Sequence, residues 1–175
     1  GLMTNSGSSA NLIGVQALNL KKGTKVITPS LTFSTTVSPL VQSGLKPLFI
    51  DVERETMQID TSVLKRIPLE GVSAICVPNL IGNVANWEEI YHFAKENNLK
   101  TIEDSADTIG YKYSSEIDNW SDVSTTSFYA SHVVTGAGFG GMTCFSDKEH
   151  FDLALSLRGW GRRSALYGET EDYER

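Results

Sequence analysis

A hydroxyl, an imidazole and a group of glycines follow one another closely in the second half of the sequence. Four residues separate Ser127 from His132, and a glycine-rich turn spans 136–141. The preceding run, 122–128, is apolar and β-branched, which predicts a buried strand. Sheets of α/β proteins present ligand sites at such strand ends. An imidazole there can move protons near neutral pH, although a lone histidine at a strand end is more often structural.

Small hydroxyl residues and a glycine open the first predicted helix. Ser6, Gly7, Ser8 and Ser9 precede apolar side chains at helical spacing, 12–20. A serine in this position caps free backbone N–H groups of the helix. The same helix N-terminus, with its amides and hydroxyls, can also bind a phosphate. The sequence leaves both functions open.

Three further groups fall at predicted strand ends or helix starts. Phe33 precedes the second predicted helix, where its ring could stack on a planar ligand or pack in the core. The strand predicted at 100–104 ends in Glu103 and Asp104, and Asp107 follows. Pyridoxal chemistry needs such a set: a phosphate cradle, a stacking ring and a carboxylate that keeps the pyridine nitrogen protonated.

Strands and helices alternate along the chain and position these groups. The sequence predicts no strand in residues 1–5. It predicts strands at 25–28, 48–52, 73–78, 100–104, 122–128 and 142–145, and helices from about 6, 32, 62, 86 and 146. Pro39 predicts a bend or a late start in the second helix. This alternation is typical of a mostly parallel, right-handed α/β sheet flanked by helices, with ligands at the carboxyl ends of the strands.

Composition limits the class of protein. The chain has 175 residues, enough for one domain, and its net charge of −6 argues against a nucleic-acid or anionic-membrane partner. No apolar run approaches the roughly 20 residues of a membrane helix. Cys76 and Cys144 lie in apolar runs, which predicts buried thiols and a reducing, cytoplasmic location. The abrupt start and the charged tail 169–175 indicate a piece of a longer protein, lacking an N-terminal segment and a small C-terminal domain.

The order and spacing of the motifs resemble the DegT/StrS-type sugar aminotransferases, which have the aspartate-aminotransferase fold. The resemblance runs over nearly the whole chain, through Ser6-Gly7-Ser8-Ser9-Ala10, Pro29-Ser30-Leu31-Thr32-Phe33, Phe49-Ile50-Asp51-Val52, Glu103-Asp104-Ser105-Ala106-Asp107, Ser127-Phe128-Tyr129 and Gly140-Gly141-Met142. It implies that 1–175 is the cofactor-binding large domain of a pyridoxal-phosphate-dependent transferase-like fold.

The resemblance also implies a cofactor, partners and residue roles. The cofactor would be pyridoxal 5'-phosphate or pyridoxamine 5'-phosphate, and the partners a nucleotide sugar, glutamate as amino donor and a second copy of the chain in a homodimer. By the family pattern the phosphate is held by Gly7, Ser8, Ser9 and Ser127. Phe33 would stack on the ring, Asp104 would pair with the pyridine nitrogen, and Asp107 would lie near the ring's phenolic oxygen.

The sequence departs from the family at one decisive position. Family transaminases read Ser-Phe-Tyr-x-x-Lys, and that lysine links covalently to the cofactor, whereas this chain carries His132. The resemblance therefore favours the branch that dehydrates nucleotide sugars, which also has histidine there and an acidic residue at the position of Asp107. It implies a 4-keto-6-deoxyhexose 3-dehydratase of deoxysugar biosynthesis, with His132 as the base. Val133 and Phe139 differ from that branch, which usually has histidine and an acidic residue there.

Other interpretations stay open at this point. The chain could be an aminotransferase, although none of its nine lysines falls at the predicted strand mouth, or a non-catalytic cofactor-binding relative. A nucleotide-binding Rossmann domain is disfavoured because glycines 136, 138 and 140 lack the required spacing. No metal site is predicted, since no cysteine follows the Trp160-Gly161-Arg162 run that precedes an iron–sulfur cluster in one branch of the family.

Overall fold

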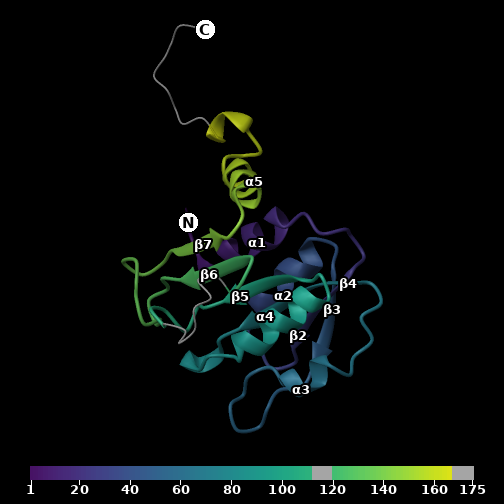
Figure 1. Ribbon diagram of the computed structural model, residues 1–175. Coiled ribbons are helices and arrows are strands. Elements are labelled where there is room, and N and C mark those ends of the chain that lie inside the picture. The colour runs from purple at the N-terminus through teal and green to yellow at the C-terminus, as the bar shows by residue number, and fades with distance from the viewer. Residues whose placement is uncertain (112–119, 167–175) are drawn as a thin grey trace, which may run out of the picture.

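The structure is a computed structural model that describes residues 1–111 and 120–166 (Figure 1). Its strands are β1 Leu2–Thr4, β2 Lys25–Pro29, β3 Lys46–Ile50, β4 Val72–Pro78, β5 Lys100–Asp104, β6 Val123–Ser127 and β7 Gly141–Phe145. Its helices are α1 Gly7–Ala17, α2 Ser34–Gln42, α3 Thr61–Leu64, α4 Trp87–Glu96 and α5 Lys148–Arg158, with short 3₁₀ turns η1 Leu80–Gly82 and η2 Arg163–Leu166. The predicted charged tail, 169–175, lies outside the described residues.

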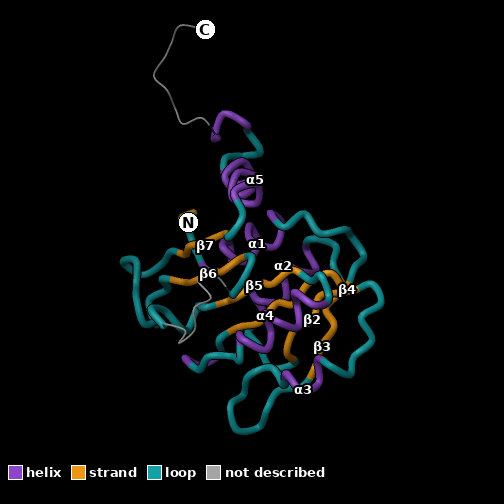
Figure 2. The backbone as a smooth tube through the Cα atoms, viewed as in Figure 1, coloured by secondary structure: helices purple, strands orange, loops and turns teal. Residues whose placement is uncertain are grey.

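In the described residues seven strands form one sheet in the order β1-β7-β6-β5-β4-β2-β3 (Figure 2). Strands β2 to β6 pair in parallel with each other, whereas β7 runs antiparallel to both of its neighbours, β1 and β6. The predicted mostly parallel α/β sheet is therefore confirmed. The carboxyl ends of β2, β4, β5 and β6 lie at the same edge of the sheet, where the predicted site residues begin.

Alternating side chains of the central strands fill two separate hydrophobic cores. Val26 and Ala74 pack with α1 and α2, while their neighbours Ile27 and Ile75 pack with α4. This is the two-residue period of a strand buried on both faces. Helices α1, α2 and α5 thus cover one face of the sheet, and α3 and α4 cover the other.

The expectation of no strand before the first helix is wrong. Residues Leu2–Thr4 form β1, which pairs with β7 at the edge of the sheet. Leu2 is buried and Met3 is exposed, as in a strand with one covered face. A strand of three residues is too short for this alternation to stand out in the sequence.

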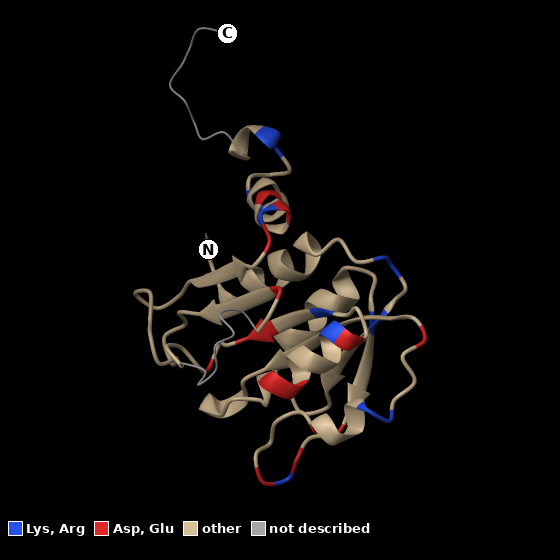
Figure 3. Cartoon of the chain, in the orientation of Figure 1, with Lys and Arg blue, Asp and Glu red and all other residues tan. Residues whose placement is uncertain are grey.

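Charge is sparse along the sheet and concentrated on the outer helices and loops (Figure 3). Three of the described strands begin with a lysine, and the acidic residues of the sheet, Glu103 and Asp104, end β5 and are both buried. Of the two free cysteines, Cys76 is buried as predicted and Cys144 is only partly so. Among the described residues, no helix has the length and apolar character needed to cross a bilayer.

Gly141 allows the close packing that places the start of α1 against the start of β7. A Cβ at residue 141 would overlap the backbone of Ser6 and Gly7. We expect Gly141→Ala to lower the free energy of unfolding by about 1–3 kcal/mol, the usual range for overpacking. Urea denaturation measures this change.

Gly23→Ala is the control for this prediction. Gly23 has φ 84°, but no atom lies within 4 Å of the added Cβ. Only the left-handed backbone penalty of about 1–2 kcal/mol applies there. A loss of unfolding free energy in Gly23→Ala that exceeds the loss in Gly141→Ala would contradict overpacking at residue 141.

Candidate functional site

The predicted residues converge on a cavity of about 710 Å³ at the carboxyl ends of β4, β5 and β6. Of the eight residues predicted for the site, the seven that line this cavity are Gly7, Ser8, Phe33, Asp104, Asp107, Ser127 and His132. Ser8, Asp104, Ser127 and His132 therefore lie at one edge of the sheet, as the sequence predicts. Ser9 does not line the cavity.

Asp104 is a buried carboxylate held by groups from two helices. Its Oδ2 accepts hydrogen bonds from Asn11 Nδ2 and Thr36 Oγ1, each 2.8 Å long, and its Oδ1 accepts one from the backbone N–H of Ala106 at 3.2 Å. Burial raises the pKa of the Asp104 carboxyl above its ordinary 3.8, and the hydrogen bonds from Thr36 and Asn11 offset only part of that rise. A cationic N–H group in the cavity would relieve this burial penalty.

Asn11 joins α1 to α2 as well as to Asp104. Its Oδ1 accepts a hydrogen bond from the Thr125 hydroxyl, so the Nδ2 group faces Asp104. The same Nδ2 donates to the carbonyl oxygen of Thr35 at 3.2 Å. That carbonyl lies four residues before Pro39, which has no N–H to offer it. Asn11 thus satisfies the carbonyl that the proline leaves free.

The N-terminus of α1 and the end of β6 form one end of the cavity. Gly7 packs so closely on Ser127 that a Cβ at residue 7 would lie 2.6 Å from the Ser127 Cβ. Ser127 Oγ accepts the Tyr129 N–H at 3.3 Å and keeps its own proton available. Gly7 and Ser8 are the first two residues of α1, so their N–H groups have no acceptor within the helix. Two free amides, a free hydroxyl and a helix N-terminus can together bind a phosphate.

Ser9 takes part in the capping of α1 and does not line the cavity. Ser6 is the N-cap of α1, and its Oγ accepts the backbone N–H of Ser9 at 3.1 Å. The Ser6 hydroxyl in turn donates to Ser9 Oγ at 3.1 Å. The sequence left capping and phosphate binding open. Ser6 and Ser9 hydrogen-bond to each other at the start of α1, and Ser6, Gly7 and Ser8 line the cavity.

Glu103 points to the opposite face of the sheet from Asp104. Its Oε1 accepts hydrogen bonds from Asn79 Nδ2 and Ser105 Oγ, each 2.8 Å long. Asn79 Oδ1 accepts from the Trp87 indole N–H at 2.9 Å and from the Ala85 N–H at 3.1 Å. Because neighbouring strand residues alternate faces, only one of the two adjacent carboxylates reaches the cavity.

His132 lies beside Asp107 in the wall of the cavity. Its Nε2 is 3.7 Å from Asp107 Oδ1, and its ring meets that of Tyr129 edge to face at 5.8 Å. The backbone N–H of His132 donates to Tyr129 O at 3.0 Å. The loop that carries both rings is closed by hydrogen bonds between Phe128 and Gly140 and between Gly136 and Phe128. The backbone that carries the imidazole is therefore held at the strand mouth.

Large apolar side chains surround the cavity mouth and remain exposed. The exposed fractions are 67% for Phe33, 75% for Ile81, 74% for Val133 and 69% for Phe139. All of these except Val133 line the cavity. Of the two fates that the sequence left open for Phe33, core packing is excluded, and its ring is free to contact a ligand.

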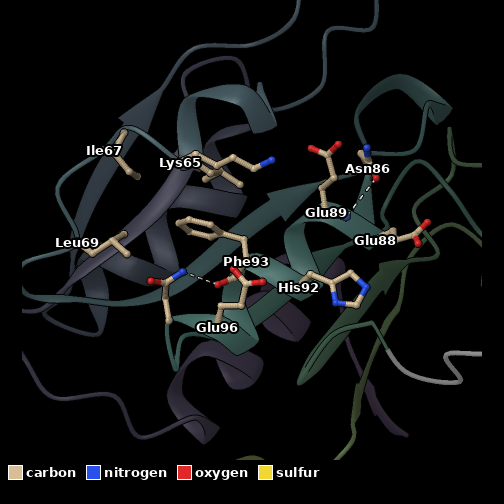
Figure 4. Close-up of a pocket in the computed structure, with 11 residues that line it drawn as sticks. Lys65, Ile67, Leu69, Asn86, Glu88, Glu89, His92, Phe93 and Glu96 are labelled. Carbon is tan, nitrogen blue, oxygen red and sulfur yellow. Dashed lines mark hydrogen bonds between the residues drawn. The ribbon is translucent and has the colours of Figure 1, made fainter.

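A second cavity of about 670 Å³ lies between α3 and α4, away from these residues (Figure 4). Its walls carry Lys65, Phe93 and the acidic side chains of Glu88, Glu89 and Glu96. None of the predicted site residues lines it. The chemistry predicted from the sequence is confined to the cavity at the strand ends.

Three contributors to the site are missing from the sequence prediction. Asn11 and Thr36 hold Asp104, and Ile81 donates its N–H to Asp107 Oδ2 at 3.1 Å. Asn11 gives a signal in hindsight, as a polar residue among apolar ones at the start of a helix. Ile81 gives none, because its contribution comes from its backbone.

The fold of the chain matches that of solved pyridoxal-phosphate enzymes. A solved structure described as GDP-4-keto-6-deoxymannose-3-dehydratase with a trapped PLP-glutamate geminal diamine superposes with a TM-score of 0.86 at 29% identity. The match covers 97% of this chain and 47% of that one. The chain therefore has the large-domain fold of the pyridoxal-phosphate aminotransferase-like enzymes, as the sequence predicts.

The family model for the DegT/DnrJ/EryC1/StrS aminotransferase family matches residues 1–173, and the chain belongs to this family. It is 38% identical over 170 residues to the lipopolysaccharide biosynthesis protein RfbH of Salmonella typhimurium, a match covering 92% of this chain and 39% of RfbH. It is 37% identical over 169 residues to the dTDP-4-dehydro-2,6-dideoxy-D-glucose 3-dehydratase of Saccharopolyspora spinosa, covering 91% and 36% of the two chains. The chain thus spans less than half the length of these relatives.

Replacing Asp104 with asparagine tests the burial of the carboxyl group through the pH dependence of stability. The folded-state pKa lies above the ordinary 3.8, so the native state binds this proton more tightly than the unfolded chain does. The free energy of unfolding of the wild type, relative to Asp104→Asn, should fall as the pH rises from about 4 toward neutrality. Urea denaturation across this range measures the difference.

Asp122 is the matched control with the opposite sign. Partial burial favours a higher pKa for Asp122, but hydrogen bonds from Thr101 and Lys100 outweigh burial and hold the pKa below 3.8. The ionised Asp122 contributes to the free energy of unfolding above pH 3.8, and this contribution is lost as the pH falls below 3.8 toward the lower pKa of the folded state. The stability of the wild type relative to Asp122→Asn should therefore rise with pH. If the stability of the wild type relative to each variant changed with pH in the same direction, the opposite pKa shifts assigned to Asp104 and Asp122 would be contradicted.

Proposed function

We propose that the chain is the cofactor-binding part of a nucleotide-sugar 3-dehydratase that uses pyridoxal or pyridoxamine phosphate. One observation carries the proposal: the cavity has the family's site residues but presents His132 where the transaminases have lysine. Among the described residues, no lysine lines this cavity. The described lining of this cavity therefore offers no amine as a covalent anchor for the cofactor and presents a proton-transfer group in its place.

The residues fit such a cofactor in three places. The free amides of Gly7 and Ser8 and the hydroxyl of Ser127 suit the phosphate. The buried Asp104 carboxylate suits a protonated pyridine nitrogen, and a charge-assisted hydrogen bond of this kind is worth about 1.5–3 kcal/mol. The exposed ring of Phe33 at the cavity mouth suits the planar face. The cavity volume of about 710 Å³ falls in the usual range for ligand sites.

The proposed reaction divides the chemistry between the cofactor and the chain. When bound, pyridoxamine phosphate supplies an amine that condenses with a 4-keto sugar and a ring that accepts electrons. Asp104 keeps the ring nitrogen protonated. His132 would take the proton from the carbon beside the condensed amine and would return it to the sugar's C3 hydroxyl, which would leave as water. The names of the dehydratase relatives support a nucleotide-linked keto sugar as the substrate class.

Glutamate is the proposed amino donor, because an amine that leaves the cofactor with the product would have to be replaced. One structural relative is described as holding a trapped PLP-glutamate geminal diamine, and this supports glutamate as the donor. An ordinary sugar aminotransferase would use the same donor but would need an anchoring lysine. The histidine therefore favours the dehydratase.

Replacing His132 tests the proposed base. We expect His132→Asn to keep pyridoxamine phosphate binding and to slow sugar dehydration by about 10²–10⁴, the usual general acid–base contribution. Binding is measured by cofactor absorbance after gel filtration, and dehydration by product analysis. Borohydride treatment with pyridoxal phosphate should leave no covalent label at residue 132 in the wild type, whereas His132→Lys should become labelled there.

His92→Asn is the control for this series, because His92 is exposed on α4 and does not line the cavity that contains His132. It should change neither binding nor turnover. Dehydration by His132→Asn at the wild-type rate would remove the histidine from the chemistry. The non-catalytic cofactor-binding interpretation gains support only if the wild type binds the cofactor and dehydrates no keto sugar.

We also propose that a second copy of the chain covers the cavity mouth in a homodimer. The support is the group of exposed apolar side chains around the mouth, since contiguous exposed apolar surface marks interaction sites. A dimer would bury Ile81, Val133 and Phe139 and would close the cavity from solvent.

Sedimentation equilibrium tests the homodimer. We expect the wild type to sediment at twice the mass of one chain, and Val133→Asp to shift the equilibrium toward monomer by about tenfold or more, because burying an unpaired charge at an interface is unfavourable. Val41→Asp is the matched control, since Val41 is exposed on α2, outside the cavity lining. A monomeric wild type, or equal effects of the two variants, would contradict this surface as the interface.

A further inference from the structure

The buried amide of Asn11 is held by groups from three elements of the fold. Its Nδ2 donates to Asp104 Oδ2 at 2.8 Å and to Thr35 O at 3.2 Å, while its Oδ1 accepts the Thr125 hydroxyl. An ionised carboxylate and a carbonyl oxygen only accept hydrogen bonds, so both require the NH₂ end of the amide. The Thr125 hydroxyl donates and requires the oxygen end. Strands β5 and β6 and helix α2 therefore agree on which end of Asn11 faces Asp104.

The two side chains that bond Asp104 Oδ2 differ in what they permit. Asn11 Nδ2 and Thr36 Oγ1 each lie 2.8 Å from this oxygen. A hydroxyl can turn and accept a hydrogen bond, so Thr36 can serve the carboxyl group with or without its proton. An NH₂ group only donates, and its bond is strongest to a charged oxygen. Asn11 therefore favours the ionised form of Asp104.

The charged groups around Asp104 do not favour ionisation. Burial, and after it repulsion from Asp107, raise the pKa of Asp104, whereas the hydrogen bonds from Thr36 and Asn11 lower it. The other titratable groups beside it are Cys76 on β4 and, in the cavity wall, Tyr129 and His132. Among the described residues that line the cavity, none is lysine or arginine. Neutral donors must therefore keep this carboxylate ionised.

We propose that Asn11 is a positioning residue that holds Asp104 as an ionised acceptor, so that the cavity selects a ring with a protonated nitrogen over one without an N–H group. Asn11 acts through Asp104 and takes no part in the proton transfers. The inference rests on the proposed function for the identity of the ligand, but the ionisation of Asp104 is a property of the protein without ligand.

Asn11→Leu tests the first half of this inference, because leucine has a similar size and no donor. Carboxyl ¹³C spectra of aspartate-labelled protein, without cofactor, follow the titration of Asp104, whose signal is the one missing from Asp104→Asn. We expect the pKa of Asp104 to be higher in Asn11→Leu than in the wild type, because the ionised form has lost a donor.

Asn86→Leu is the matched control for this titration. Asn86 is the N-cap of α4, accepts one hydrogen bond from the Glu89 N–H and does not line the cavity. The same substitution there removes a hydrogen bond and should leave the titration of Asp104 unchanged. If Asn11→Leu does not fold, Asn11→Ser replaces it, since the serine side chain is too short to bond Asp104.

Ligand selection is measured with pyridoxamine 5'-phosphate and its 1-deaza analogue, in which C–H replaces the ring nitrogen. We expect the wild type to bind pyridoxamine phosphate more tightly in calorimetric titrations. Asn11→Leu should reduce this preference about tenfold or more, the effect of one hydrogen bond to a charged group. A general loosening of the site would weaken both ligands equally and leave the preference unchanged, as expected for Asn86→Leu.

The two measurements separate the role of Asn11 from the identity of the ligand. An unchanged titration of Asp104 in the Asn11 variant would overturn the inference, and so would an unchanged preference between the two ligands. Equal binding of both ligands by the wild type would overturn it as well. A wild type that binds neither ligand, together with a raised pKa of Asp104 in the variant, would support the role of Asn11 and overturn the proposed function.

Discussion

The site depends on one buried carboxylate and on the donors that make its burial tolerable. Asp104 ends a central strand, where an ionised group without partners would be strongly destabilising. Asn11 from α1, Thr36 from α2 and the Ala106 amide supply three donors. These bonds fix the starts of two helices relative to β5. The N-terminal residues of α1 and the ring of Phe33 before α2 are thereby brought to the cavity that this carboxylate lines.

On the opposite face of the sheet, hydrogen bonds to a second buried carboxylate, Glu103, also connect a strand end to a helix. Asn79 links Glu103 to Trp87 of α4, and the turn that follows Asn79 presents the Ile81 amide to Asp107. The alternation of a single strand thus directs one carboxylate to each layer of helices. The cavity lies where the sheet ends, because only there can groups from both layers meet.

The sequence predicts the sheet, the strand order of the motifs and seven of the residues that line the cavity, because these follow from periodicity and from local turn chemistry. It cannot predict the partners of Asp104, since Asn11 and Thr36 are brought to it only by the packing of two helices. Ile81 is beyond sequence reasoning for another reason: its contribution is a backbone amide aimed by a left-handed conformation. Ser9 was assigned by its position in a motif, but the local competition for the helix N-terminus assigns it to capping.

The division of the site between two layers has a consequence for how the chain folds. Until α1 and α2 dock, Asp104 has neither Asn11 nor Thr36, and until α4 docks, Asn79 lacks the Trp87 indole. The helices that exclude water from each face of the sheet therefore bring with them the partners of the polar groups that they bury. A cavity able to recognise its ligand then arises only when both layers have docked.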